Sequence, residues 1–536
     1  MAIRVERGIR QALPDGTALT LDLWLPEQIR CAPLIVRTPY SRGLHPIARP
    51  LDALRMMDEG IPLVIQDVRG RGSSEGDFSP FLREPSDTID TLAWVSQQPW
   101  AIGPPAMAGP SYSGFLQYQA LSARTPTLSA ICPQFAPLDL YLDWAYRQGV
   151  FELGTAKWWH LQAIALTQST RVPGSPDAPR IRQMVDDLVH TGYRNMSHLG
   201  APADALAPTY RQWVDHLDRD AYWNKHTRSP MRGWRPSKPV PALITAGWFD
   251  VFLRGSIRAY HALREANHRP RLIIGPWAHV STLGSYPNQS FGAQASADAI
   301  DLSGLHAQFL LAASSAEELS GPEVRAFLMG RNTWLELDEW PPGPAQSVDV
   351  NLSDCRGTPT TPAMATLRLD PDHLVPSVGG ATLMPGAYAN HEVGPVDCER
   401  ILTHPNCLIL RLPRQATARA FVGPISLTLC VKSSSDLADI HASLVQVRSG
   451  GRSSLIVDGA VLVGKQNYVV IDLADTAVVP DSAAMVLLVL SASSFPRYAP
   501  SPQLRSADGK TEAVPTEIDL ANSWLTITQI TDDKRF

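Results

Sequence analysis

Cysteine is scarce in this sequence, with six residues among 536, and none of the six is spaced as a CxxC pair. The sequence also has no HExxH motif and no tight cluster of histidine and cysteine, so we expect no metal and no metal cofactor. So low a cysteine density favours free, buried thiols in a reducing compartment. We therefore expect a cytoplasmic protein whose chemistry, if it has any, uses other side chains.

Long apolar runs and runs of like charge are missing as well. The most apolar run, residues 485–490, is far too short to span a bilayer. The first residues carry charges and no apolar h-region, so we expect no signal peptide. Net charge is only −5 and no basic cluster stands out, which argues against a nucleic-acid partner. These features predict a soluble protein with no membrane association, and they leave homo-oligomerisation open.

The pattern of apolar residues divides the chain into three kinds of region. Residues 1–140 alternate apolar strands with helical segments, and strand signals return over 236–315, which is typical of a parallel α/β sheet. The intervening residues 141–235 are mainly helical and predict an inserted cap. From about residue 320 to 536, many short alternating strands are punctuated by turn residues, which predicts an all-β sandwich.

The strongest chemical signal is the segment GPSYSG at 109–114, which follows an apolar strand and precedes a plausible helix. A serine on such a sharp turn presents its hydroxyl at the top of the sheet, and the amide of the next residue, Tyr112, can bind an oxyanion. The strict GxSxG pattern would need glycine where Ser113 stands. Ser111 is the candidate nucleophile.

A serine nucleophile needs a base and a carboxylate that orients the base. Asp250 follows the predicted strand 240–245, and His279 follows the predicted strand 271–274. Both therefore fall at the carboxyl ends of parallel strands, where ligands bind in open α/β sheets. Their order after Ser111 is the order of the α/β-hydrolase triad, so we predict Ser111 as nucleophile, His279 as base and Asp250 as its partner.

Five blocks of the sequence resemble the family of serine hydrolases that groups bacterial cocaine esterase with X-prolyl dipeptidyl peptidases. The blocks are RTPY at 37–40, DVRGRGSSEG at 67–76, GPSYSG at 109–114, GWFD at 247–250 and GPWAH at 275–279. The family pattern GxSYxG is met in full, with Gly114 in place of the strict glycine. The resemblance implies an α/β-hydrolase domain, an inserted helical cap and a C-terminal jelly-roll domain.

The resemblance also implies roles for individual residues. The Tyr40 hydroxyl would form the oxyanion hole together with the Tyr112 amide. The cap of this family roofs the acyl pocket, so Trp158 and Trp159 line that pocket or else pack one cap helix on another. Phe252 is a further candidate for the pocket wall. The glycine-rich block at 67–76 has Glu75 where a dinucleotide motif needs glycine, so we expect no nucleotide cofactor there.

The residues after Asp250 bear on the substrate. Relatives that hydrolyse α-amino acid esters hold the substrate ammonium with clustered acids, but here Val251 and Phe252 follow Asp250. We therefore expect a small-molecule acyl ester as substrate. An amidase, an aminopeptidase or an acyltransferase that uses the same acyl-enzyme chemistry stays open. A non-catalytic binding protein with a vestigial hydrolase domain is the remote alternative.

Overall fold

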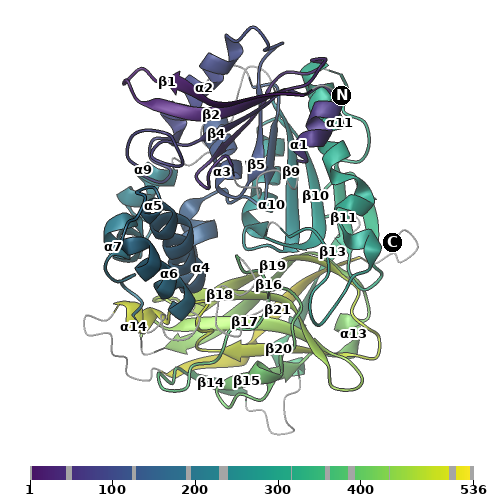
Figure 1. Ribbon diagram of the computed structural model, residues 1–536. Helices are drawn as coiled ribbons and strands as arrows, with labels where there is room; N and C mark the ends of the chain where they lie inside the picture. The colour runs from purple at the N-terminus through teal and green to yellow at the C-terminus, as the bar shows by residue number, and fades with distance from the viewer. Residues whose placement is uncertain are drawn as a thin grey trace.

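A ten-stranded sheet forms the first of three parts of the molecule (Figure 1). The computed structural model describes residues 3–43, 51–122, 128–188, 195–227, 239–279, 281–315, 317–343, 345–355, 363–383, 393–433, 435–505 and 515–530. The strand order is β1-β2-β4-β3-β5-β6-β9-β10-β11-β12. The strands are β1 (Arg4–Ala12), β2 (Ala18–Leu25), β3 (Leu34–Thr38), β4 (Leu63–Asp67), β5 (Ala106–Pro110), β6 (Ile131–Gln134), β9 (Pro241–Phe249), β10 (Arg269–Ala278), β11 (Val324–Leu328) and β12 (Thr333–Leu337).

The middle of this sheet is parallel, from β4 through β11, whereas β2 and β12 run antiparallel to their neighbours. Buried residues on its two faces fall into separate clusters, as expected for parallel strands that helices cover on both sides. One face packs on α1 (Ala53–Asp58) and α11 (Leu302–Ser315), the other on α2 (Glu84–Ser96), α3 (Tyr112–Ser122) and α10 (Leu253–Glu265). This confirms the predicted α/β class.

A helical insertion separates β6 from β9 and lies beside the sheet in Figure 1. Its helices are η2 (Leu140–Ala145), α4 (Leu153–Trp158), η3 (Trp159–Leu166), α5 (Thr167–Ser169), α6 (Asp177–Leu188), α7 (Ala203–Leu206), α8 (Thr209–Asp215) and α9 (Ala221–Thr227). A short hairpin of β7 (Tyr146–Arg147) and β8 (Val150–Phe151) interrupts them. Both η2 and η3 are π-helical, a rare geometry that is frequent at functional sites. No helix within the described ranges is long and apolar enough to cross a membrane.

The C-terminal part, here called the β domain, packs two antiparallel sheets face to face (Figure 1). The first contains β13 (Ala345–Asn351), β21 (Pro515–Ile530), β16 (Phe421–Ser433) and β19 (Tyr468–Val478), with β14 (Met364–Arg368) also on β21. The second contains β15 (Cys407–Arg411), β20 (Met485–Ser491), β17 (Asp439–Val447) and β18 (Ser453–Leu462). Short helices η7 (Leu352–Asp354), α12 (Glu399–Leu402), α13 (Arg414–Thr417) and α14 (Ser501–Arg505) join them.

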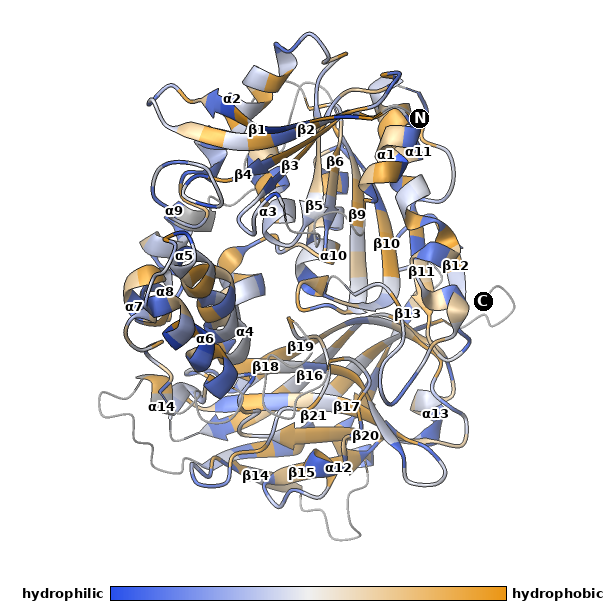
Figure 2. Ribbon diagram, in the orientation of Figure 1, coloured by the Kyte–Doolittle hydropathy of each residue, from blue (hydrophilic) through white to orange (hydrophobic). Residues whose placement is uncertain are grey.

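Alternating burial along β16 explains why these residues form a sandwich. Ile425, Leu427, Leu429 and Val431 are buried, while the residues between them are only half-buried. Because side chains of a strand alternate between its faces, one face enters the core and the other does not. The central strand β20 is buried on most positions and mostly hydrophobic in Figure 2. The predicted antiparallel β domain is therefore confirmed.

Two strands that follow residue 320 pair with the large sheet. Strand β11 pairs in parallel with β10, and β12 pairs with β11, so residues 324–337 extend the large sheet. The first strand of the β domain is β13, which begins at Ala345. Apolar alternation identifies a short strand but does not say which sheet it joins, because the pairing partner is distant in sequence.

The β domain packs directly on the other two parts. Met329, just after β11, exchanges backbone hydrogen bonds with β19, since its amide donates to Ala477 at 2.9 Å and its carbonyl accepts from Val479 at 2.9 Å. Arg254 of α10 forms an ion pair with Asp472 at 3.1 Å. The three parts therefore form one continuous body around the ends of the parallel strands (Figure 1).

Candidate active site

Ser111 lies on the sharp turn between β5 and α3 with a φ of +57°. A positive φ is rare for a residue that carries a side chain and is a form of strain that occurs at functional sites. The two glycines near Ser111 are required because a side chain would not fit at either position. A Cβ at Gly109 would lie 2.8 Å from the Cβ of Ser113, and a Cβ at Gly114 would lie 2.5 Å from that of Ala136. Ser113 therefore fits where the strict motif has glycine.

Asp250 and His279 meet just beyond the carboxyl ends of β9 and β10. The Nδ1 of His279 donates to Oδ1 of Asp250 at 2.7 Å, which fixes the ring and leaves Nε2 as the basic nitrogen. Phe252 packs edge-on against this ring, with centroids 5.2 Å apart, and Phe135 does so at 6.3 Å. Ser111, Asp250 and His279 are 4%, 1% and 4% exposed, so the site is enclosed.

Tyr40 follows β3, the neighbour of β5, and its hydroxyl reaches the site. The indole Nε1 of Trp159 donates to this hydroxyl at 3.1 Å, and the hydroxyl is within hydrogen-bonding reach of the Ser111 side chain. Burial raises the pKa of Tyr40, so the phenol keeps its proton at neutral pH. Because its oxygen accepts from Trp159, the proton is free to be donated elsewhere.

Tyr112 is the first residue of α3, so its amide has no partner inside the helix and is free to bind an anion. Its side chain has a different role. The hydroxyl donates to Glu84 at 2.8 Å and accepts from the amide of Phe81 at 3.0 Å, and the ring stacks on Phe81. Glu84 in turn pairs with the buried Arg37 at 2.8 Å. This group anchors the start of α3 behind Ser111.

Arg71 lies in the glycine-rich loop after β4 and connects two segments that border the site. Its buried guanidinium donates to the carbonyl of Pro39, next to Tyr40, at 2.7 Å and to the carbonyl of Ala163 in η3 at 2.7 Å. It therefore holds the Tyr40 segment against the helix that carries Trp159. Gly72 allows the loop to turn back on Asp67, since a Cβ there would lie 2.1 Å from that carboxylate. Sequence reasoning assigned Arg71 no individual role.

An aromatic cluster from the cap covers the site. Trp159 lies between Trp144 and Trp213, with centroids 4.7 and 6.0 Å away, and stacks on Phe81 at 6.0 Å. Trp144 also contacts Phe252, at 5.0 Å. Sequence reasoning missed Trp144, whose only signal was an aromatic residue in the cap.

The two tryptophans predicted from the cap are placed differently. Trp159 contacts Tyr40 directly. Trp158 is half-buried at the end of α4 and packs on the main apolar cluster. Within the described parts of the chain, Trp158 makes no hydrogen bond or ring contact with Trp159's neighbours at the site. The pocket assignment of Trp158 therefore stays a prediction.

His160 is a buried histidine of the aromatic cluster. Its burial predicts that the free energy of unfolding falls in acid. Burial lowers its pKa to about 3, whereas histidine in an unfolded chain has a pKa near 6.5. Below pH 6.5 the unfolded state therefore binds a proton that the folded state does not. The free energy of unfolding should fall by about 2 kcal/mol between pH 7 and pH 5 from this residue alone.

The matching variant is His160→Phe, which keeps a ring against Trp213 and Tyr210 but cannot titrate. Denaturant unfolding followed by tryptophan fluorescence at pH 7 and pH 5 should show the variant losing about 2 kcal/mol less than the wild type. Equal losses in the two proteins would show that His160 is protonated in the folded state.

Comparison with known proteins agrees with this geometry. Residues 15–281 match the X-Pro dipeptidyl-peptidase (S15 family), and residues 319–528 match the X-Pro dipeptidyl-peptidase C-terminal non-catalytic domain. The chain belongs to the S15 family. It is 29% identical to the cocaine esterase of Rhodococcus sp. (strain MB1 Bresler) over 92% of each chain. As a family member it is a serine hydrolase that acts on ester or amide bonds.

Two solved structures of more distant sequence share the fold over nearly the whole chain. An aminopeptidase from the marine sediment archaeon Thaumarchaeota archaeon has a TM-score of 0.80 at 19% identity, covering 98% of this chain and 97% of its own. An α-amino acid ester hydrolase has a TM-score of 0.76 at 18% identity, covering 98% and 96%. At these identities the likeness establishes the three-part architecture of this S15-family chain.

Proposed function

We propose that this S15-family hydrolase cleaves acyl esters through an acyl-enzyme on Ser111. The observation that carries the proposal is the strained elbow of Ser111, with the Tyr40 hydroxyl in reach and the bonded Asp250–His279 pair on neighbouring strand ends. In this mechanism His279 takes the proton of Ser111 as the oxygen attacks the ester carbonyl carbon. Asp250 holds the tautomer and stabilises the imidazolium that forms.

The negative charge of the tetrahedral intermediate would fall on the former carbonyl oxygen. The Tyr112 amide and the Tyr40 hydroxyl are the two donors for it. Collapse of the intermediate breaks the ester C–O bond, and His279 gives its proton to the leaving alcohol. A water molecule then attacks the acyl-enzyme, with His279 again as base, and releases the acid and free Ser111.

The charges around the site favour a neutral acyl group over a free amino terminus. An enzyme that binds an ammonium group needs an unpaired carboxylate in the pocket. Buried carboxylates in and near the cap are engaged by arginines, among them Glu84 with Arg37, Asp143 with Arg258 and Glu152 with Arg147. Asp250 is bonded to His279 and followed by the buried, apolar Val251 and Phe252. An aromatic, uncharged wall suits an apolar acyl group.

A fluorophosphonate probe and a substrate panel test this proposal together. The probe should label Ser111, as read by peptide mass spectrometry, because it reacts with an activated serine. The panel compares p-nitrophenyl acyl esters, the matching anilides, and aminoacyl esters. We expect the neutral acyl esters to have the largest kcat/KM. A preference for the aminoacyl compounds or the anilides would replace the esterase with an aminopeptidase or an amidase, and net acyl transfer to an added amine would indicate an acyltransferase.

Tyr40→Phe should lower kcat by about 10²- to 10³-fold with little change in KM. The variant removes only the hydroxyl and keeps the ring. The loss falls on kcat because a donor to the oxyanion strengthens as charge develops in the transition state. Steady-state kinetics on the best p-nitrophenyl ester measure both constants.

Trp159→Phe is the matched control for Tyr40→Phe, because it removes the donor to the Tyr40 oxygen and leaves the Tyr40 proton in place. Its loss in kcat should be smaller than that of Tyr40→Phe. A raised KM with unchanged kcat in Tyr40→Phe would instead make Tyr40 a substrate-binding residue, and the second oxyanion donor would have to be another group.

A further inference from the structure

A segment of the β domain reaches the loop that carries Asp250. Residues 375–383, here called the strap, follow β14 in the chain. Near their end Thr382 pairs with Asp250 in an isolated parallel β-bridge. Thr382 is fully buried. The strap lies within the region that matches the C-terminal non-catalytic domain of the family, yet it contacts the candidate catalytic acid.

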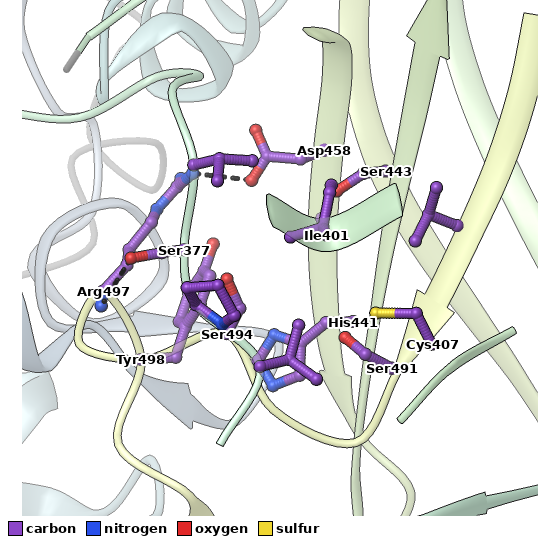
Figure 3. A pocket seen from close by; sticks show the side chains of 15 residues that line it. Ser377, Ile401, Cys407, His441, Ser443, Asp458, Ser491, Ser494, Arg497 and Tyr498 are labelled. Carbon is purple, nitrogen blue, oxygen red and sulfur yellow. Dashed lines mark hydrogen bonds and ion pairs between the residues drawn. The ribbon is translucent and has the colours of Figure 1, made fainter. Parts of the chain in front are cut away.

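The strap is fixed by the β domain itself. The amide of Ser377 donates to Phe495 at 2.8 Å, and the amide of Phe495 donates to Val375 at 2.9 Å. Gly380 sits so closely over Asp458 that a Cβ would lie 2.7 Å from its Oδ1. Asp458 is held by Arg497 at 2.6 Å, and Figure 3 shows this pair beside Ser377. The part of the strap that leads to Thr382 is therefore held by the sandwich.

Two complementary polar atoms are left without a partner where the strap meets Asp250. Oδ1 of Asp250 accepts from His279, but Oδ2 is buried and has no hydrogen-bond partner among the residues that the structure describes. The hydroxyl Oγ1 of Thr382 is in the same situation. A buried carboxylate oxygen without a donor is costly, and native proteins satisfy nearly all such atoms with protein groups or ordered water. One group is an acceptor and the other a donor, on two residues whose backbones pair.

We propose that the Thr382 hydroxyl donates to one bound water, that this water donates to Oδ2 of Asp250, and that Thr382 is thereby a positioning residue for the acid–base pair. This inference rests on the proposed function, in which Asp250 orients His279. A hydrogen bond to Oδ2 holds the carboxylate so that Oδ1 faces Nδ1 of His279. The β domain thereby completes the active site with a residue that touches no substrate.

The test compares Thr382→Val, which keeps the shape and removes the hydroxyl, with Thr382→Ser, which keeps the hydroxyl. We expect Thr382→Val to lower kcat by about 10- to 100-fold with KM within about twofold, the range for losing one hydrogen bond to a charged group. Thr382→Ser should stay within about threefold of the wild type. Thr476→Val is the matched control, because Thr476 is a buried β-domain threonine whose hydroxyl also lacks a partner among the described residues, and its kcat should stay within about twofold.

A double-mutant cycle separates positioning from a general structural effect. In an Asp250→Ala background, Thr382→Val should change kcat by less than about threefold, because the group that it positions is gone. A full additive loss there would overturn the inference, and so would an unchanged kcat of Thr382→Val beside an inactive Asp250→Ala. An active Asp250→Ala would instead overturn the proposed triad. If Thr382→Val does not fold, Thr382→Cys, with similar size and a weak donor, takes its place in the cycle and should likewise lower kcat.

Discussion

Ser111→Ala should lower kcat on the best ester by about 10⁴- to 10⁶-fold while the protein keeps its thermal unfolding midpoint. The oxygen that attacks the carbonyl is then absent, so no acyl-enzyme forms and the remaining donors can act only on a water reaction. Alanine fits the turn as well as serine does, because both residues must adopt the same positive φ. Labelling by the fluorophosphonate probe should disappear together with turnover.

Ser113→Ala is the matched control for this experiment. Ser113 is a buried serine of the same elbow, and its hydroxyl donates to the Arg37 carbonyl at 2.6 Å. Losing that bond should cost some stability but leave kcat within about tenfold, since the reacting oxygen is intact. If Ser111→Ala retained most of its turnover and Ser113→Ala were inactive, Ser113 would be the nucleophile.

The sequence was informative wherever a chemical group follows directly on a strand. The carboxyl ends of parallel strands share one edge of a sheet, so residues just after them are brought together whatever the intervening chain does. Tyr40 after β3, Ser111 after β5, Asp250 after β9 and His279 after β10 all follow this rule. The α/β class and the antiparallel β domain are confirmed, and the bond between Asp250 and His279 is observed. Their catalytic roles stay predictions.

Contacts that depend on packing between distant segments could not be predicted in this way. Arg71 bonds both the Pro39 carbonyl and Ala163 of η3, which lies 92 positions from Arg71 in the sequence. The Thr382–Asp250 bridge joins the β domain to the loop after β9. No local pattern encodes such partners, because each side chain has several competing neighbours that only the folded chain selects. The same limit applies to β11 and β12, because β11 joins the large sheet by pairing with β10 and β12 joins it by pairing with β11.

The backbone amide and the side chain of Tyr112 have different roles. The elbow motif predicts the use of its amide, and the structure adds that the side chain is tied to Glu84 and stacked on Phe81. Burial raises the pKa of Glu84, and its ion pair with Arg37 opposes that effect. The tyrosine of the GxSYxG pattern therefore anchors the elbow, which explains why a large aromatic residue stands beside Ser111.

His279→Ala should lower kcat about as strongly as Ser111→Ala, by about 10⁴- to 10⁶-fold, because the nucleophile and its base act as one unit. Without the imidazole, no group removes the Ser111 proton as the new C–O bond forms, and no group protonates the leaving alcohol. The double variant Ser111→Ala/His279→Ala should be hardly slower than either single variant, since the unit is already broken.

The alternative base to exclude is His160, which lies beside Trp159 in the aromatic cluster. Its Nδ1 is bonded to the Ala156 carbonyl at 2.7 Å and its pKa is lowered to about 3, so it is a neutral ring held inside the cap. His160→Phe should therefore retain turnover within about tenfold, whereas His279→Ala should not. The reverse result, an active His279→Ala with an inactive His160→Phe, would require the base to come from the cap, and the Asp250–His279 bond would then be a structural feature of the loops that follow β9 and β10.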